Sequence, residues 1–438
     1  MKNWLYFILL VLLPVFHGKA QAPVSYNAAN IYQRIAKLKV LGAVLYVAAH
    51  PDDENTRLLG WLSNERLYRT GYLSLTRGDG GQNLIGDEQG IELGLIRTQE
   101  LLAARRIDGA EQFFSSAFDF GFSKSTDEAL RIWGKERVLA DAVWVIRNFQ
   151  PDVIITRFPP DNRAGHGHHS ASSVIAAEAF KAAADPKRFP EQFKYGVKPW
   201  QAKRIFWNSY NFGGADYTSE NQLKANVGGY NTMLGKSYGE IAAESRSQHK
   251  SQGFGVPASR GSMTDYFSFT DGSPAESDLM QDVNTAWSRI NATNITLSID
   301  NILKNYRVNA PGASVPALVK LYKEINALPD GYWKNIKLKE LKDIIAAASG
   351  LWLEAFTIIP KVTQGEKFNI NISINNRDGA VIQVKNISIE NKDTVLNVTA
   401  ATNSNINFVT RLKVDDNKNV SQPYWLVNKM NSGSFNIT

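Results

Sequence analysis

Residues 44–54 read Val-Leu-Tyr-Val-Ala-Ala-His-Pro-Asp-Asp-Glu, an apolar run that ends in one histidine and three acidic side chains. An apolar run of this length is typical of a β-strand that is buried on both faces. The same pattern predicts further strands, with helices between them, and these segments alternate along the first half of the chain. Strands are expected at 72–76, 153–156 and 205–208, and helices at 26–40, 55–66, 90–107, 126–148 and up to about 184. This alternation indicates βαβ units and an α/β fold with a mainly parallel sheet.

Histidine is rare in this chain and strongly clustered. Of six histidines, three lie in Gly165-His166-Gly167-His168-His169, beyond the expected strand at 153–156, and His50 directly follows the strand at 44–49. Ligands of parallel sheets bind at the carboxyl ends of the strands, so the two clusters are expected to meet there. Histidine is the commonest metal ligand near neutral pH, and aspartates add oxygen donors. The pattern predicts a metal-dependent enzyme.

The residue types also suggest the chemistry. His50, Asp53 and one histidine of the second cluster would give three protein ligands and leave a coordination position for water, as in catalytic zinc sites. Such a metal lowers the pKa of bound water from about 15.7 to roughly 7. Asp52 is the natural general base beside it. A histidine of the second cluster that does not bind metal can stabilise an oxyanion or protonate a leaving amine.

The stretch His50-Pro51-Asp52-Asp53-Glu54 after an apolar strand, followed later by Gly-His-x-x-His, resembles the PIG-L/LmbE-like metal-dependent N-deacetylases. The resemblance spans roughly residues 40–255. It includes Thr76-Arg77-Gly78-Asp79-Gly80 and Arg97-Thr98-Gln99-Glu100-Leu101, which look like the family's second-strand loop and following helix.

The resemblance implies a Rossmann-like fold with helices on both faces of the sheet. It implies Zn²⁺ held by His50, Asp53 and His169, although this ligand set also suits other divalent ions such as Fe²⁺. Asp52 is then the general base and His166 the oxyanion-stabilising or acid group.

One position departs from the family pattern. The family usually reads Gly-His-x-Asp-His, and this chain has His168 where that aspartate is expected. An acid there could support His166 electrostatically, whereas a histidine normally supplies no negative charge. His168 is therefore expected to contact substrate or to serve as an alternative ligand, and the pH optimum is expected to differ from that of the family.

Two arginines complete the candidate site. Arg97 and Arg77 could hold a substrate hydroxyl or phosphate, because guanidinium suits oxyanions. They could equally pair with Glu100 and Asp79 to hold the loops. The assignment to substrate binding is slightly favoured for Arg97.

Less specific interpretations exist for the same residues. Asp52 or Asp53 could be a helix N-cap, and the three-histidine segment an exposed loop. His249 could line the pocket or lie in a solvated loop. The phenylalanines between 113 and 122 could form a sugar-stacking wall, although core packing is the commoner use of such residues.

Composition limits the class of protein. The 438 residues predict two or three domains, and the formal charge of +7 is spread along the chain, so nucleic-acid binding is not expected. Cysteine is absent, which excludes disulfides and thiolate metal sites. The first twenty residues read as a secretory signal, with Lys2, an apolar run at 4–16 and Gly18-Lys19-Ala20. No later apolar stretch is long enough to span a membrane, so an exported protein, periplasmic or secreted and soluble, is expected.

The domain prediction follows from changes in pattern. We expect a signal peptide at 1–20, a catalytic domain at 21–275, a helical segment at 276–350 and an antiparallel β-sandwich-like module at 351–438. Within the helical segment, helices are expected at 281–305, 316–327 and 333–349. Asn-Arg-Asp-Gly at 376–379 reads as a hairpin turn. The β-pattern continues to the last residue, so the natural module is expected to extend further.

The function expected from these observations is zinc-dependent removal of an N-acetyl group from an amino sugar, such as N-acetylglucosamine, or a glycoconjugate. Two alternatives remain open at this stage. One is a zinc amidase or esterase that acts on a non-sugar substrate, and the other is a catalytically impaired glycan-binding protein. His168 in place of the expected aspartate is the feature that favours the latter.

Overall fold

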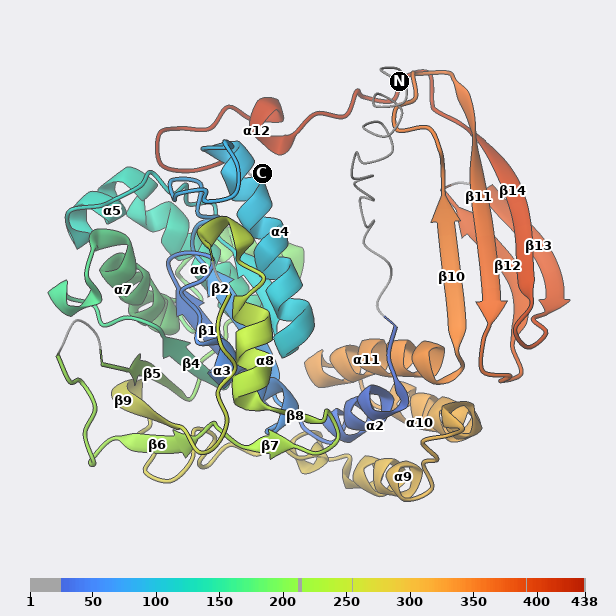
Figure 1. Ribbon diagram of the computed structural model, residues 1–438, viewed down its shortest axis with the longest axis horizontal. Helices are drawn as coiled ribbons and strands as arrows, with labels where there is room; N and C mark the ends of the chain where they lie inside the picture. The colour runs from blue at the N-terminus through green and yellow to red at the C-terminus, as the bar shows by residue number, and fades with distance from the viewer. Residues whose placement is uncertain (1–24, 212–214, 254, 391, 437–438) are drawn as a thin grey trace, which may run out of the picture.

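The computed structural model describes residues 25–211, 215–253, 255–390 and 392–436, so the expected signal sequence lies outside the described residues. A seven-stranded sheet forms the centre of the α/β part (Figure 1), in the order β3-β2-β1-β4-β5-β9-β6. Its strands are β1 (Ala43–Ala48), β2 (Arg69–Ser74), β3 (Glu111–Phe114), β4 (Val153–Thr156), β5 (Arg204–Ser209), β6 (Leu223–Asn226) and β9 (Thr264–Gly272). The first five strands of this order are parallel, and β9 runs antiparallel to both β5 and β6. The mainly parallel sheet is confirmed, while β3, β6 and β9 were not predicted.

Helices cover both faces of this sheet, as expected. In β1, Leu45 and Val47 pack into one apolar cluster, and Val44 and Tyr46 pack into the other. Every residue of β1 is buried, which explains why its sequence is apolar without alternation. The first cluster includes side chains of α5 (Thr126–Trp133), α6 (Lys135–Phe149) and α7 (Gly167–Ala182); the second includes side chains of α3 (Thr56–Asn64), α4 (Ile91–Asp108) and α8 (Tyr238–Arg246).

The helix expected at 126–148 is divided into two. Gly134 separates α5 from α6 with a φ angle of 76°, a left-handed conformation that glycine adopts at little cost. The hydrophobic periodicity continues across the break, so the sequence pattern did not reveal it.

The order of the strands places the two histidine clusters together. β1 lies between β2 and β4, and the direction of the crossover connections reverses at this point. The carboxyl ends of β1 and β4 therefore flank the crevice where parallel sheets bind ligands. The residues that follow these two strands are the ones that carry His50 and His166–His169.

The helical segment shares its core with the α/β part. α9 (Thr293–Lys304), α10 (Val315–Asn326), α11 (Tyr332–Ala348) and the early helix α2 (Ala28–Lys37) belong to the same apolar cluster as α6 and α7. The helix expected at 281–305 begins only at Thr293, after a short 3₁₀ turn at Trp287–Ile290. Trp287 is fully buried and donates its indole N–H to the carbonyl of Leu38, which ties this turn to the end of α2.

The C-terminal module consists of antiparallel strands, as expected. β10 (Leu351–Phe356), β11 (Lys367–Asn376) and β14 (Asn405–Lys413) form one sheet, and β12 (Gln383–Ile389) pairs with β13 (Lys392–Thr399). The predicted hairpin at 376–379 is wrong, because β11 and β12 do not pair with each other. The turn is real, with Gly379 at φ 75°, but the Asn376 amide donates to Ala380 and Ala400 and directs the chain into a second sheet.

The last described residues return to the α/β part instead of continuing the β-pattern. After β14 the chain crosses back through α12 (Tyr424–Val427) to lie beside α5 (Figure 1). The Phe435 N–H donates to Ser116 at 2.8 Å, and the Phe118 N–H donates to Gly433 at 2.9 Å. Phe435 is 1% exposed.

A short hairpin of β7 (Tyr230–Asn231) and β8 (Lys236–Ser237) precedes α8. Among the described residues, no helix has the length and apolar character needed to cross a membrane.

Candidate active site

The turn after β1 is sharply bent and held by several donors. Asp52 has a φ angle of 88°, which is strained for a residue with a side chain. Arg97 donates to the Pro51 carbonyl and, at 2.9 Å, to Oδ1 of Asp52, and Arg246 donates to the Asp52 carbonyl. The N-cap of α3 is Asn55, whose side chain accepts from Leu58 at 3.1 Å. Neither Asp52 nor Asp53 is therefore needed as a helix cap.

Asp53 lies between two histidines from different parts of the chain. Its Oδ2 is 3.1 Å from Nδ1 of His50, and its Oδ1 is 3.4 Å from Nε2 of His169. Burial by itself would raise the pKa of Asp53, but His169 and then His50 hold it well below its usual value. The carboxylate is thus anionic, and it contacts both histidines that were proposed as ligands together with it from the sequence.

The other ring nitrogen of His169, Nδ1, forms a hydrogen bond with the backbone. Its Nδ1 lies 2.8 Å from the carbonyl oxygen of Ala164, which can only accept a hydrogen bond, so Nδ1 carries the proton. Nε2 faces Asp53 as a hydrogen-bond donor, and its lone pair would face a metal ion bound between the two side chains. The ring also stacks on Phe158, with centroids 3.8 Å apart and planes 7° from parallel. A metal-ligating histidine usually donates its other N–H to a carbonyl or carboxylate in this manner, so the donor set fits a divalent metal.

His50 connects two groups of candidate ligands. Suitable atoms of His50, His166 and His169 lie within 4.8 Å of one another, and so do those of His50, Asp119 and His168. The first group opens to solvent at His166 and His169, whereas all three residues of the second are buried. Nε2 of His50 lies 3.1 Å from Nδ1 of His168. When Nδ1 of His50 faces a metal, its Nε2–H can donate to His168.

His168 does not occupy a position that a substrate can reach, in contrast to the substrate-binding role expected from the sequence. Its side chain is 0% exposed, stacks on Trp133 at 4.6 Å and meets the edge of Phe120 at 4.4 Å. Burial, followed by the neighbouring His50 and His166, lowers the pKa of His168 to about 2. His168 is therefore a neutral acceptor for His50, and it stands where the family has an acid.

His166 faces the open side of the cluster. Its Nδ1 lies 3.2 Å from Oγ of Ser123. The same oxygen accepts a hydrogen bond from the backbone N–H of His168 at 2.6 Å. The Ser123 hydroxyl proton is thus available to donate to Nδ1, which leaves the proton of the neutral ring on Nε2. Burial, then His169 and His50, lowers the pKa of His166 to about 3, so the ring is neutral near pH 7. A neutral Nε2–H is a hydrogen-bond donor suited to an oxyanion.

Asp52 and Arg97 form a pair beside the cluster. Burial raises the pKa of Asp52; Arg97 opposes this shift, and the adjacent Asp53 reinforces it. A carboxylate with a raised pKa is a better proton acceptor in catalysis than an ordinary one. Arg97 is 3% exposed and also donates to the Gly78 carbonyl. It therefore stabilises two loops and also orients the side chain of Asp52. It does not pair with Glu100, which binds Ser251 instead.

Arg77 is placed away from the cluster. It donates to the Ser115 carbonyl, and its guanidinium lies 4.9 Å from the ring of Phe114 and 5.6 Å from that of Phe435. These contacts join the loop after β2 to the C-terminal segment, and Arg77 lines neither of the cavities at the candidate site.

A buried charged network behind the turn was not found from the sequence. Glu54 is 3% exposed; its Oε2 accepts the Asp52 N–H, and its Oε1 lies 3.0 Å from Arg105 and 3.1 Å from Nε2 of His249. Burial alone would raise the pKa of Glu54, but Arg105 and His249 lower it to about 2. His249 is 0% exposed, so it neither lines the pocket nor lies in a solvated loop. The signal in the sequence was a third acid, Glu54, at the end of the run that follows the apolar strand.

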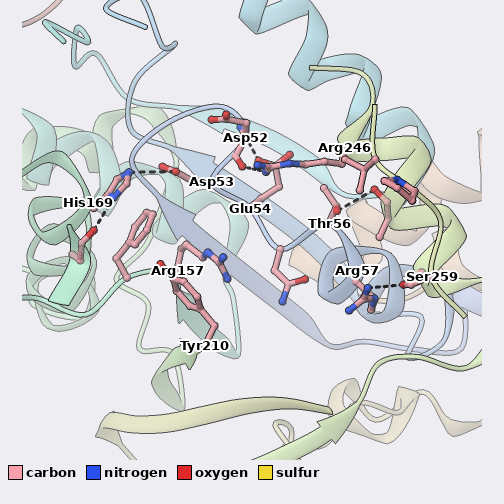
Figure 2. Close-up of a pocket in the computed structure, with 18 residues that line it drawn as sticks. Asp52, Asp53, Glu54, Thr56, Arg57, Arg157, His169, Tyr210, Arg246 and Ser259 are labelled. Carbon is pink, nitrogen blue, oxygen red and sulfur yellow. Dashed lines mark hydrogen bonds and ion pairs between the residues drawn. The ribbon is translucent and has the colours of Figure 1, made fainter. Parts of the chain in front are cut away.

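Two cavities meet at the cluster and share Asp52, Asp53 and His169 as lining residues. One, of about 510 Å³, is lined by His50, His166, Arg97 and the loop at 80–82. Its rim includes Phe122, which is 77% exposed with its ring centroid 5.6 Å from that of His166. The other, of about 420 Å³, extends toward Arg57, Arg157, Tyr210 and Ser259 (Figure 2). A bound molecule can thus reach the cluster from two sides.

Comparison with known proteins gives matches to the segment that carries this site. Residues 45–180 match the family model described as PIG-L, GlcNAc-PI de-N-acetylase. A 1D-myo-inositol 2-acetamido-2-deoxy-alpha-D-glucopyranoside deacetylase of Rhodococcus opacus is 32% identical over 184 residues, 37% of this chain. A mycothiol S-conjugate amidase of Streptomyces coelicolor is 28% identical over 182 residues, 38% of this chain. The chain spans 60% of the length of each of these two relatives.

Among solved structures, one match is N,N'-diacetylchitobiose deacetylase from Pyrococcus horikoshii. It is 18% identical, with a TM-score of 0.37 over 49% of this chain and 71% of that protein. The segment that matches the PIG-L family model, residues 45–180, carries both histidine clusters. The two relatives carry the names of a deacetylase and an amidase.

Proposed function

We propose that this protein is a metal-dependent hydrolase that removes an N-acetyl group from an amino sugar or glycoconjugate. The observation that carries the proposal is Asp53 bridging Nδ1 of His50 and Nε2 of His169, within the segment that matches the PIG-L family model. Zn²⁺ is the proposed metal, because two histidines and one carboxylate with an open position form a catalytic zinc site. Fe²⁺ is the alternative that the same donors allow.

His50, Asp53 and His169 would hold the metal. A divalent ion bound there supplies Lewis acidity to the amide carbonyl and to the attacking water. Asp52 takes the proton of that water, since its carboxylate borders both cavities and its pKa is raised. Nε2–H of His166 donates to the carbonyl oxygen as negative charge develops on it. The amine then leaves with the proton that Asp52 received.

Arg97 and Ser123 act through these groups. Arg97 fixes the orientation of Asp52, and Ser123 fixes the tautomer of His166. The exposed ring of Phe122 at the rim offers a flat apolar surface of the kind on which sugar rings stack.

The residue assignments are tested by two substitutions that separate metal binding from turnover. Asp52→Ala should retain metal but lose most acetate release from N-acetylglucosamine conjugates, whereas His50→Ala should lose both. Wild-type turnover by purified Asp52→Ala would refute its role as general base. Acetate release from simple amides or esters but not from amino sugars would favour a non-sugar amidase or esterase.

We also propose that the chain is exported. The support is the pattern of Lys2, the apolar run at 4–16 and Gly18-Lys19-Ala20. Cleavage after Ala20 would leave Gln21 as the first residue, so mass spectrometry of the protein from the extracytoplasmic fraction tests the assignment. A full-length chain in the cytoplasm would contradict it.

A further inference from the structure

The cavity of about 420 Å³ has a wall built from arginines of three different elements. Arg57 comes from α3, Arg157 directly follows β4, and Arg246 ends α8. The same cavity is lined by Asp53 and His169, so the arginines face the proposed metal site across one space. Figure 2 shows Arg157 between Tyr210 and the Asp53–His169 pair, and Arg57 beside Ser259 on the far side.

Neither Arg57 nor Arg157 forms an ion pair with another described residue. Among the described residues, no carboxylate oxygen lies within 4.0 Å of either guanidinium. Arg57 donates from Nη2 to Oγ of Ser259 at 2.8 Å, and its Nε is buried without a hydrogen-bond partner. Arg157 lies 3.8 Å from the centroid of the Tyr210 ring. Arg97 and Arg105 differ in this respect, because each contacts a carboxylate at 3.0 Å or less.

Two carboxylates act on these arginines without an ion-pair contact: Asp53 acts on Arg157, and Asp265 acts on both arginines. Asp265 accepts from the Asn55 amide at 2.7 Å, and its field reaches Arg157 and Arg57 without direct contact. Burial raises the pKa of Asp265 to about 6, although the two arginines oppose the shift. The cavity thus holds two guanidinium groups that contact no carboxylate directly, so their N–H donors can bind an anion that enters the cavity.

We propose that Arg57 and Arg157 form an oxyanion subsite, which binds a phosphate or carboxylate group carried by the amide substrate. Guanidinium binds both groups through paired N–H donors, and such charge-assisted hydrogen bonds are stronger than neutral ones. The inference rests on the proposed deacetylase function and extends it, because it makes the preferred substrate an anionic amino sugar. Ser259 and Tyr210 border the same space and can add hydroxyl contacts.

The test compares substrates that differ only in charge. Acetate release by the metal-loaded protein is measured with methyl N-acetylglucosaminide, N-acetylglucosamine 1-phosphate, N-acetylglucosamine 6-phosphate and N-acetylmuramic acid. At least one anionic compound should have a kcat/KM about tenfold or more above that of the neutral glycoside. Preference for the phosphates or for the carboxylate identifies the anion. Equal kcat/KM for neutral and anionic compounds would overturn the subsite and leave the proposed function intact.

Two variants locate the preference. Arg57→Gln and Arg157→Gln should each reduce the ratio of anionic to neutral kcat/KM about tenfold. Arg163→Gln is the matched control, since Arg163 is exposed, pairs with Asp161 and lines neither cavity. A ratio that survives both substitutions would contradict the inference.

Calorimetry with inorganic phosphate separates the subsite from the proposed function. If no amino sugar releases acetate, the deacetylase proposal fails, but the subsite is still judged by binding. Phosphate affinity that falls about tenfold in Arg57→Gln, and not in Arg163→Gln, supports it. Affinity that is equal in all three proteins places the phosphate elsewhere, for example on the metal, and overturns it.

Discussion

Nε2 of His50 lies 3.1 Å from Nδ1 of His168, a fully buried residue that stands where the family pattern has an aspartate. The candidate metal ligand His50 therefore has a neutral imidazole as its outer partner, with Asp119 next to it at 3.6 Å from His168. Outer partners of this kind orient metal-ligating histidines and raise their basicity.

His168→Phe is expected to weaken metal binding. Trp133 and Phe120 already surround the side chain with aromatic rings, so a phenylalanine can fill the space. Loss of the acceptor for His50 should reduce metal affinity by about tenfold, the lower end for such partners. Competition with a chromogenic chelator measures the affinity. Unchanged affinity in a folded variant would show that His168 does not support His50.

Ser123→Ala is expected to slow turnover without loss of metal. Without the hydroxyl, nothing fixes the proton of His166 on Nε2, and a part of the population carries it on Nδ1 instead. We expect kcat to fall roughly tenfold with KM nearly unchanged, as for other residues that orient catalytic groups. Ser172→Ala, whose hydroxyl donates to the His169 carbonyl within α7, is the control. Equal kcat in wild type and Ser123→Ala would contradict the tautomer assignment.

Asp265→Asn is expected to change how stability depends on pH. The pKa of Asp265 is about 6 in the folded protein and about 4 when unfolded, so protonation favours the folded state. The wild type therefore loses stability as pH rises from about 4 to about 6, by at most about 3 kcal/mol. Asparagine can still accept from Asn55 and does not titrate. Urea unfolding from pH 4 to 8 should show the variant gaining relative stability up to about pH 7 and no further. A difference that is independent of pH would contradict the prediction.

Phe435→Ala is expected to release the C-terminal segment from the α/β part. Phe435 packs against Phe118 and Tyr424, and its N–H donates to Ser116. Truncation of a buried phenylalanine costs about 3–5 kcal/mol. We expect this loss to exceed the free energy that holds the short C-terminal segment in place. Amide hydrogen exchange should accelerate at Phe118 and Phe435 but not in β1 or β4. Leu426→Ala, at a side chain that is 64% exposed, should leave exchange unchanged. Equal protection at Phe118 in Phe435→Ala and wild type would mean that the contact is not needed for docking.

The convergence of His50, Asp53 and His169 could be predicted because it depends on local patterns. Each cluster follows an apolar strand, and adjacent parallel strands bring their carboxyl ends to one edge. The antiparallel strand β9 could not be found in this way, since only Phe267 among its residues is buried and the alternation is weak. The alternating pattern of the C-terminal module predicted strands, but it did not show which strands pair with each other.

The roles of His168, Glu54 and His249 depended on contacts between distant segments. His168 is enclosed by Trp133 and Phe120, and Glu54 meets His249 across 195 positions of sequence. No local spacing shows that a histidine is enclosed by aromatic rings or paired with a buried acid. The sequence therefore indicated which side chains are chemically able to act, and the packing decided which of them face the cavities.

The central claim is that a metal held by His50, Asp53 and His169 is required for amide hydrolysis. Acetate release from an N-acetylglucosamine conjugate should be measured on the purified protein, after chelation, and after return of one equivalent of Zn²⁺. We expect release to stop on chelation and to recover with the added ion. Release that continues in metal-free protein, or none from a fully loaded protein with any amino sugar, would contradict the account.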